Sequence, residues 1–226
     1  MPRGAPPLAR ATLSNVLQGL YVLTDTAHSR GRTTQEVVQA AVRGGAAVVQ
    51  LREKQLAGAA LRDLASRLRD ICRAGDCTFI VNDDPRLAAE VGADGVHLGP
   101  DDAPPEEARQ LLGPSAEVGW SAKGSLDMAA QAQARGASYI AAGSMFPTQT
   151  KVGATVVGPD VIRAMREVTS LPIAAIGGIT LENVAAVVAA GADMICTASG
   201  VVGAANVEEA CRQFVGEIEK ARGRRR

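Results

Sequence analysis

The chain has 226 residues, a formal net charge of zero and an aromatic content of 3%. That length suits a single β/α domain with a complete core. A neutral chain with few aromatic side chains lacks the basic field and the stacking surfaces that nucleic-acid binding needs, so we expect no nucleic-acid partner. The sequence contains no long apolar span and no signal peptide, so we expect no membrane association.

Domain limits and compartment are predicted from local composition. No linker rich in Pro, Gly or Ser divides the chain. Residues 1–18 contain three prolines and no acidic residue, which predicts a disordered leader, with a transit peptide as the weaker alternative. Residues 19–220 are predicted to form the catalytic domain and residues 221–226 a basic tail. The cysteines lack a paired C-x-x-C spacing, which predicts buried free thiols in the cytoplasm at Cys72, Cys77, Cys196 and Cys211.

The strands are predicted from runs rich in Val, Ile and Leu, which are typical of parallel strands buried on both faces. In chain order, eight such runs span residues 20–24, 48–52, 78–82, 95–98, 117–120, 139–142, 173–176 and 194–198. Segments with helical spacing lie between them, for example residues 35–43, 61–72, 126–135 and 181–190. Helix starts are expected at Pro104, which precedes Glu106 and Glu107, and at Thr180 with Asn183.

A repeat of Gly-Ala pairs indicates how these units are arranged. Four pairs, which begin at Gly45, Gly92, Gly136 and Gly191, each lead into an apolar run. They lie about 50 residues apart, which is the length of two βα units and predicts a barrel built in quarter turns. Eight alternating strands and helices close into a (β/α)8 TIM barrel. An open doubly wound sheet is the alternative, but residues 21–30 lack its glycine-rich phosphate loop.

Polar residues follow most of the predicted strands, at the end of a barrel where active sites are built. They are Gln50, Arg52, Glu53 and Lys54; Asn82, Asp83 and Asp84; His97, Asp101 and Asp102; Ser121 and Lys123; and Thr148, Thr150 and Lys151. The chain has four lysines against twenty arginines, yet three of the lysines belong to this set. Because a lysine ammonium is a compact charge suited to phosphate, we expect Lys54, Lys123 and Lys151 to bind phosphate groups.

Two aspartates predict a metal site. Asp83 and Asp102 follow adjacent strands, and two close carboxylates repel each other unless a proton or a divalent cation joins them. Hard oxygen ligands beside phosphate-binding lysines suit Mg²⁺ on a diphosphate. The alternative is that either aspartate caps the next helix, which is the role expected of Asp84, before Pro85, and of Asp101.

A second phosphate site is predicted after the last two strands. The turns at Gly177-Gly178 and at Ser199 stand where barrels commonly hold a phosphate on backbone N–H groups and a helix N-terminus. The site would then take a diphosphate and a monophosphate. His97, inside the fourth strand, is expected to be a satisfied interior residue, and Trp120 is expected either to line a heterocycle pocket or to fill the barrel.

Taken together, these residues resemble those of the thiamine phosphate synthase family. The shared motifs are Gln50-Leu51-Arg52-Glu53-Lys54, Val81-Asn82-Asp83, Gly95-Val96-His97-Leu98-Gly99 with Asp102, Gly119 with Ser121, Phe146-Pro147-Thr148-Gln149-Thr150-Lys151, Ile176-Gly177-Gly178-Ile179 and Ala198-Ser199. The strings Q-x-R-x-K and P-T-x-T-K, in that order, are highly specific, whereas the Gly-Gly turn is not. The resemblance covers nearly the whole chain apart from its two ends.

The resemblance implies a transferase that joins an aminopyrimidine methyl diphosphate to a thiazole phosphate, or to its carboxylated form, and yields thiamine phosphate and pyrophosphate. It implies pyrimidine diphosphate contacts from Gln50, Asn82 and a catalytic group of Arg52, Lys54, Ser121 and Lys151. It implies one Mg²⁺ per subunit on Asp83 and Asp102. It implies thiazole phosphate contacts from Thr148, Thr150, Gly178, Ala198 and Ser199.

The sequence departs from the family pattern at Pro100, where Gln is frequent, and at Lys123, where His is frequent. Three alternatives stay open: a thiazole tautomerase of the same fold, a barrel enzyme acting on a sugar phosphate, and a catalytically silent barrel that binds a thiamine precursor. The intact set of phosphate and metal residues argues against the first and the last. Residues 146–158 are the expected lid over the site. The oligomeric state stays open, with a homo-oligomer as one alternative.

Overall fold

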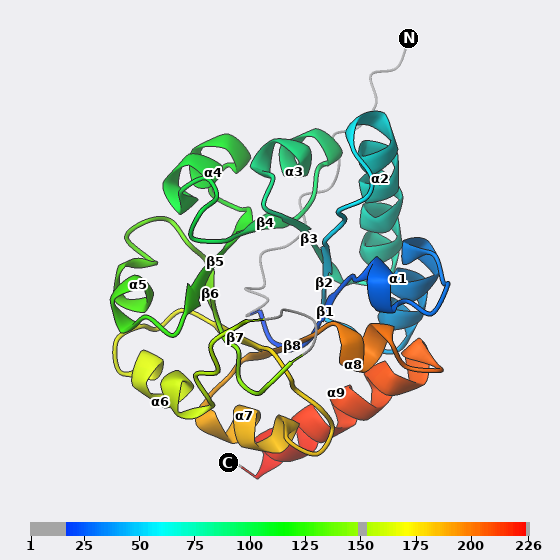
Figure 1. Cartoon of the computed structure of the whole chain (residues 1–226). Helices are drawn as coiled ribbons and strands as arrows, with labels where there is room; N and C mark the ends of the chain where they lie inside the picture. The colour runs from blue at the N-terminus through cyan, green and yellow to red at the C-terminus, as the bar shows by residue number, and fades with distance from the viewer. Residues whose placement is uncertain (1–16, 149–152, 225–226) are drawn as a thin grey trace, which may run out of the picture.

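The structure is a computed structural model that describes residues 17–148 and 153–224. Within them, eight parallel strands form a closed barrel in which each strand pairs with its neighbours in the chain and β8 pairs with β1 (Figure 1). The strands are β1 (Gly19–Leu23), β2 (Val48–Leu51), β3 (Thr78–Asn82), β4 (Gly95–Leu98), β5 (Glu117–Lys123), β6 (Tyr139–Ala142), β7 (Ile173–Ile176) and β8 (Met194–Thr197). The predicted (β/α)8 barrel is confirmed.

Helices surround the barrel (Figure 1). They are α1 (Thr34–Arg43), α2 (Gly58–Ala74), α3 (Pro85–Val91), α4 (Pro105–Leu112), α5 (Leu126–Gln131), α6 (Asp160–Arg166), α7 (Val184–Ala190), α8 (Ser199–Val202) and α9 (Val207–Gly223), with a short 3₁₀ helix at Thr26–His28. Asp84 caps α3 by accepting two backbone N–H groups at 2.9 and 3.0 Å, as predicted. The same prediction for Asp101 is wrong, because the loop before α4 continues to Pro104, which takes the cap position.

Several element boundaries differ from the prediction, and three of them have a visible cause. β5 continues to Lys123, beyond the predicted end at residue 120, because its last residues pair with β6 after a shift in register. α5 is shorter than predicted, and the chain turns before Gly136, whose φ of 89° suits glycine. α7 begins at Val184 rather than 181, because the Asn183 side chain accepts the N–H of Thr180 at 2.8 Å and holds the preceding turn.

The apolar core forms two layers, one inside the barrel and one between the strands and the helices. Successive side chains of a strand point to opposite faces, so β5 directs Gly119 and Ser121 inward and Trp120 outward. Trp120 belongs to the outer layer, where the guanidinium carbon of Arg135 lies 4.9 Å from its ring centroid. Trp120 therefore neither lines a pocket at the mouth nor fills the barrel, and both alternatives expected for it are wrong.

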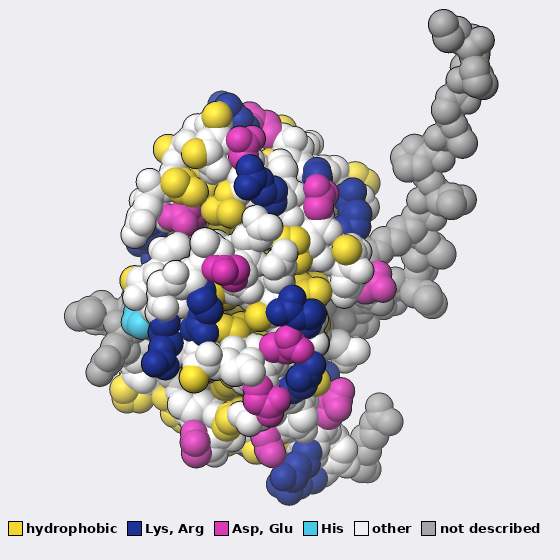
Figure 2. Space-filling view, turned by 90° about the vertical axis from the view of Figure 1, so that its right-hand side faces the viewer, with side chains coloured by type: hydrophobic (Ala, Val, Ile, Leu, Met, Phe, Trp, Pro, Cys, Tyr) yellow, Lys and Arg dark blue, Asp and Glu magenta, His cyan; other side chains and the backbone are white. Residues whose placement is uncertain are grey.

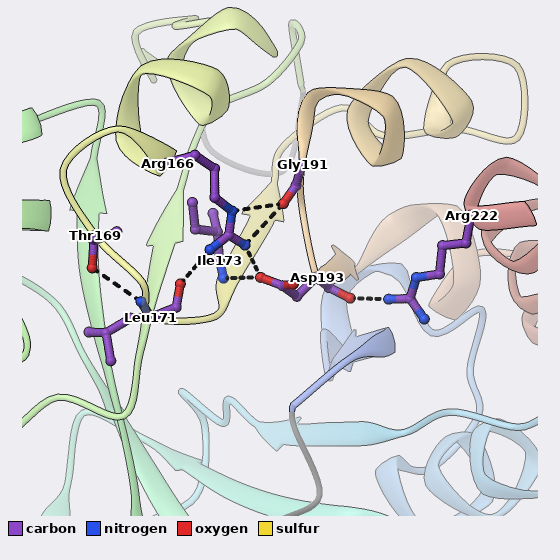
Figure 3. A network of polar contacts seen from close by, with 7 residues as sticks. All are labelled: Arg166, Thr169, Leu171, Ile173, Gly191, Asp193 and Arg222. Atoms are coloured by element: carbon purple, nitrogen blue, oxygen red, sulfur yellow. Dashed lines mark hydrogen bonds and ion pairs between the residues drawn. The ribbon is translucent and has the colours of Figure 1, made fainter. Parts of the chain in front are cut away.

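A polar cluster closes the N-terminal ends of two neighbouring strands, and we call it an end clamp (Figure 3). Arg166, at the end of α6, donates from Nε to the Gly191 carbonyl at 3.1 Å and pairs with the Asp193 carboxylate. Asp193 also accepts the backbone N–H of Ile173, the first residue of β7, at 2.8 Å. The clamp thus joins α6 to the starts of β7 and β8 and satisfies a buried N–H group.

The end clamp recurs at two other Gly-Ala pairs, which explains the repeat in the sequence. In each, a polar residue directly after the pair accepts an N–H at the start of an odd-numbered strand, and an arginine from the preceding helix binds a carbonyl at the turn. The polar residue, the donor residue and the arginine are Asp94, Phe79 and Arg69 in one clamp and Ser138, Val118 and Arg109 in the other. The pair at Gly45 is followed by Ala47, which has no side-chain acceptor.

Helix α9 packs against the first elements of the described chain, α1 and β1. In its contact with α1, Glu208 accepts a hydrogen bond from Nε of Arg43 at 2.8 Å. α9 continues to Gly223, so Arg222 lies within the helix and donates to the Asp193 carbonyl, whereas the sequence predicts a tail from residue 221. Residues 225–226 and nearly all of the predicted leader, residues 1–16, lie outside the described residues.

The placement of the charged side chains and of the cysteines agrees with the composition of the sequence. Figure 2 shows acidic and basic side chains interspersed over the side of the molecule that carries α1 and α2. All four cysteines are buried and free, as predicted. In the part of the chain that the structure describes, no helix is long and apolar enough to cross a membrane.

Candidate active site

The loop after β2 is fixed to the end of β1 by a buried hydroxyl. The Arg52 N–H donates to the Thr24 hydroxyl oxygen at 2.9 Å, and this hydroxyl donates to the Arg52 carbonyl at 3.2 Å. Thr24 is only 1% exposed, so the pair holds the backbone that carries both Arg52 and Lys54. The Lys54 side chain is exposed at the C-terminal end of the barrel.

Asp83 and Asp102 form a carboxylate pair at the ends of β3 and β4. Asp83 has a φ of 65°, and its N–H donates to the His97 carbonyl at 2.8 Å. Asp102 folds back toward β4, where its Oδ2 accepts the Gly99 N–H at 2.6 Å. Desolvation, together with the hydrogen bond to Asp102 and the charge of that residue, raises the pKa of Asp83 to about 6. Two carboxylates in this arrangement share a proton or take up a cation.

Two polar side chains of the predicted site act on this pair. A hydrogen bond from Asn82 and the positive charge of Arg52 both lower the pKa of Asp83, against the larger opposing effects. The residues predicted for the diphosphate and for the metal therefore meet at the ends of β2, β3 and β4. Among the described residues, no group of three or more His, Cys, Asp or Glu side chains could hold a metal ion. A cation on the carboxylate pair would take its other ligands from water or substrate.

Gln50 and Ser121 are joined by hydrogen bonds that cross the barrel interior. Gln50 Nε2 donates to the Tyr21 hydroxyl at 2.5 Å, and the hydroxyls of Tyr21 and Tyr139 lie 3.0 Å apart. The Tyr139 hydroxyl lies 3.1 Å from Nδ1 of His97, whose Nε2 lies 2.9 Å from Ser121 Oγ. Burial lowers the pKa of His97 to about 4. Both ring nitrogens have partners, so the prediction of a satisfied interior histidine is confirmed.

The loop after β6 lies directly on the glycine turn after β7. Gly178 has a φ of 64°, and a Cβ there would lie 2.5 Å from the Pro147 carbonyl oxygen. The N–H of Phe146 donates to the Gly177 carbonyl at 2.9 Å. Glycine is required for this approach, and the approach brings the segment that carries Thr148 to the turn.

The start of α8 completes the same region. Ser199 is the first residue of this short helix and Ala198 precedes it, directly after β8. A Cβ on Gly200 would lie 3.4 Å from the carbonyl oxygen of Ile179, which follows the Gly-Gly turn. Three of the segments predicted to hold the thiazole phosphate are therefore neighbours at the ends of β6, β7 and β8.

Part of the predicted site lies outside the described residues, namely Thr150 and Lys151. After that gap the expected lid returns to the end of β6, since the Val157 N–H donates to the Ser144 carbonyl at 2.9 Å. The lid stays a prediction. Lys123 is exposed at the end of β5 with a φ of 55°, and its phosphate contact also stays a prediction.

Comparison with known proteins identifies the family of this chain. The family model described as thiamine monophosphate synthase matches residues 20–201. The thiamine-phosphate synthase of Moorella thermoacetica is 44% identical over 206 residues, which cover 91% of this chain and 98% of that protein. The chain belongs to the thiamine monophosphate synthase family. The thiamine-phosphate synthase of Chloroflexus aurantiacus is 46% identical over 196 residues, which cover 86% of this chain and 90% of that protein.

A solved member of the thiamine monophosphate synthase family has the same fold. Thiamine phosphate pyrophosphorylase from Pyrococcus furiosus gives a TM-score of 0.82 at 36% identity, covering 90% of this chain and 96% of that one. A geranylgeranylglyceryl phosphate synthase from Thermoplasma acidophilum, at 18% identity and a TM-score of 0.61, shares the fold alone. The family match includes every predicted site residue, from Gln50 to Ser199.

Sequence reasoning missed three hydroxyls that support the site. Thr24 fixes the Arg52 loop, and Tyr21 and Tyr139 join Gln50 to the far side of the barrel. A signal was available for the tyrosines, because the chain has only two and both stand in predicted strands. The sequence does not show that they face each other, since β1 and β6 are not neighbours in the barrel.

Proposed function

We propose that the chain catalyses the reaction for which its relatives are named. It joins an aminopyrimidine methyl diphosphate to a thiazole phosphate and yields thiamine phosphate and pyrophosphate. With the carboxylated thiazole phosphate as the second substrate, the carboxyl group also leaves as CO2. Family membership over residues 20–201 supports this transferase activity. Two polar regions at the strand ends, one at β2 to β5 and one at β6 to β8, support the use of two phosphorylated substrates.

One observation carries the assignment. The carboxylates of Asp83 and Asp102 are paired beside the positive charge of Arg52, and desolvation, followed by the hydrogen bond to Asp102 and the charge of that residue, raises the pKa of Asp83. A diphosphate with a divalent cation makes use of both carboxylates and the guanidinium. A thiazole tautomerase or a sugar-phosphate enzyme handles a monophosphate and needs no such pair, so the arrangement favours the synthase.

The donor set of this pair fits Mg²⁺. Carboxylate oxygens are hard ligands, and Mg²⁺ usually keeps several waters and binds through one or two carboxylates plus substrate phosphate. Asp83 and Asp102 would hold one ion per subunit. When bound, Mg²⁺ supplies positive charge against the diphosphate.

The residues of the chain act mainly on charge and orientation. The bond between the pyrimidine methylene carbon and a diphosphate oxygen breaks, and its electron pair leaves with pyrophosphate. A new bond forms from that carbon to the thiazole nitrogen, which supplies its lone pair, so the protein needs no nucleophile. Arg52, Lys54 and Lys151 stabilise the departing negative charge. The pyrimidine diphosphate is oriented by Gln50, Asn82 and Ser121.

The thiazole phosphate lies in the second region, on Thr148, Thr150, Gly178, Ala198 and Ser199. The contacts of Gly178 with the loop after β6, and of the α8 start with Ile179, support a shared pocket. The partners are thus two small heterocycles, with neither nucleic acid nor membrane. The buried free thiols support a cytoplasmic location.

The reaction is tested by pyrophosphate release with both substrates, with each substrate omitted, and with and without Mg²⁺. We expect release only when both substrates and Mg²⁺ are present, and its loss in Asp102→Ala. Asp101→Ala is the matched control, because Asp101 is the exposed neighbour and lies outside the carboxylate pair; it keeps its activity. No release by the folded wild-type protein, or release by Asp102→Ala at the wild-type rate, would contradict the proposal.

A further inference from the structure

The hydrogen bonds inside the barrel form one unbranched chain with two different ends. The chain runs from Gln50 through the hydroxyls of Tyr21 and Tyr139 to His97 and ends at Ser121. The two tyrosines are each 1% exposed or less, so their hydroxyls cannot form hydrogen bonds with bulk water. Ser121 is the end that lies near the mouth of the barrel.

The hydrogen-bond chain is continuous because residue 119, beside Tyr139 and His97, is a glycine and has no side chain. Gly119 stands between Tyr139 and His97, and a Cβ at that position would lie 2.2 Å from Tyr139 Cζ and 2.4 Å from His97 Nδ1. Any other residue at 119 would push the hydroxyl of Tyr139 away from the imidazole. The gap at Gly119 is therefore part of the hydrogen-bond chain, and not only a small residue in a barrel strand.

The direction of each hydrogen bond is set at the Gln50 end. Gln50 Nε2 donates to the Tyr21 oxygen, and a tyrosine hydroxyl has a single proton to give onward. Tyr21 therefore donates to Tyr139, and Tyr139 in turn donates to Nδ1 of His97. An imidazole that accepts at Nδ1 carries its proton on Nε2, so His97 donates to the Ser121 oxygen. The hydroxyl proton of Ser121 is then left to point away from the chain.

We propose that Tyr21, Tyr139 and His97 are positioning residues that present Ser121 to the substrate as a hydrogen-bond donor. If the hydrogen bonds ran in the opposite direction, Ser121 would donate its proton to His97. Only the lone pairs of its oxygen would then face the substrate, and lone pairs repel an anionic oxygen. A donor is what an acceptor atom of the pyrimidine diphosphate requires. This inference rests on the proposed function for its substrate, but the direction of the hydrogen bonds can be measured without any substrate.

The first experiment reads the His97 tautomer by ¹⁵N NMR of histidine-labelled protein. The chain has two histidines, and half-buried His28, paired with Asp25, serves as the internal reference. We expect His97 to be neutral with its proton on Nε2, and Tyr139→Phe to give a mixture of tautomers. A proton on Nδ1 in the wild-type protein would overturn the proposal, even if the protein failed to make thiamine phosphate.

The second experiment is a double-mutant cycle on pyrophosphate release. We expect Tyr139→Phe to lower kcat about tenfold, the upper range for one hydrogen bond, with the KM for the thiazole phosphate unchanged. In a Ser121→Ala background the same change has no further effect, because Tyr139 acts on the substrate through Ser121, while Gln50 keeps its own hydrogen bond to Tyr21. An equal loss in both backgrounds would show a merely structural role and refute the proposal.

Trp120→Phe is the matched control for packing in β5. It changes a buried aromatic residue next to Ser121 that faces the helices and takes no part in the hydrogen-bond chain. We expect it to lower stability and to leave the His97 tautomer as in the wild-type protein. A tautomer shift in this variant equal to that of Tyr139→Phe would contradict the proposed path.

Discussion

Replacing Asp193 by alanine is a direct test of what the end clamp contributes. The change removes the acceptor of two donors, the Ile173 N–H and the Arg166 guanidinium. Ile173 is fully buried, so its N–H has no water to replace the carboxylate. Arg166 is less affected, because it keeps the carbonyls of Gly191 and Leu171. The unsatisfied N–H group should therefore dominate the cost.

The expected loss follows from these two contributions. A buried donor left without an acceptor costs about 1–3 kcal/mol, and a partly exposed ion pair adds about 0.2–1 kcal/mol. We expect the free energy of unfolding of Asp193→Ala to fall by about 1–4 kcal/mol and the Tm by roughly 2–16 °C for a chain of this size. Asp193→Asn keeps an oxygen for the N–H and should lose about 1 kcal/mol or less.

The assay is urea unfolding followed by circular dichroism, with pyrophosphate release measured at a temperature where both proteins are folded. Asp63→Ala, at an exposed position of α2, is the control and should change stability by less than about 0.5 kcal/mol. Activity should not change, since the clamp lies at the opposite end of the strands from the site. The reasoning is refuted if Asp193→Ala is no less stable than Asp63→Ala, or if the asparagine variant loses as much as the alanine variant.

Three further predictions concern the site. The folded-state pKa of Asp83, about 6, lies above its ordinary value of 3.8, so ionisation of this carboxyl reduces stability as the pH rises from about 3.8 to about 6. Asp102→Asn removes the neighbouring charge and should therefore raise the Tm at pH 8 and not at pH 5. An equal change in Tm at both pH values would contradict this. Gly178→Ala places a Cβ against the Pro147 carbonyl and should raise the KM for the thiazole phosphate about tenfold, whereas an equal rise for the pyrimidine diphosphate would point to general damage. Lys151→Ala should lower kcat about a hundredfold to a thousandfold, with Lys220→Ala on α9 as control, and wild-type turnover in the first variant would remove Lys151 from the mechanism.

The elements that the sequence predicts best are those that local pattern determines. All eight strands are recognisable because parallel strands are apolar on both faces. The pairing of Asp83 with Asp102 is predictable as well, since adjacent parallel strands end side by side. The true end of β5 is not, because pairing up to Lys123 depends on a shift in register against β6. The link from Tyr139 to His97 is also invisible in the sequence, because it depends on which side chains meet across the closed barrel.

The unclamped turn at Gly45 has a consequence for how the protein is made. Here α9 takes the place of a clamp, and a Cβ on Gly44 would lie 2.5 Å from the Cβ of Cys211. Because α9 follows all eight strands in the chain, the first two strands are synthesised well before the helix that covers this end of the barrel. A nascent chain that stops before Val207 leaves apolar surface of α1 and β1 exposed, which makes it a substrate for chaperones and proteases rather than a smaller enzyme.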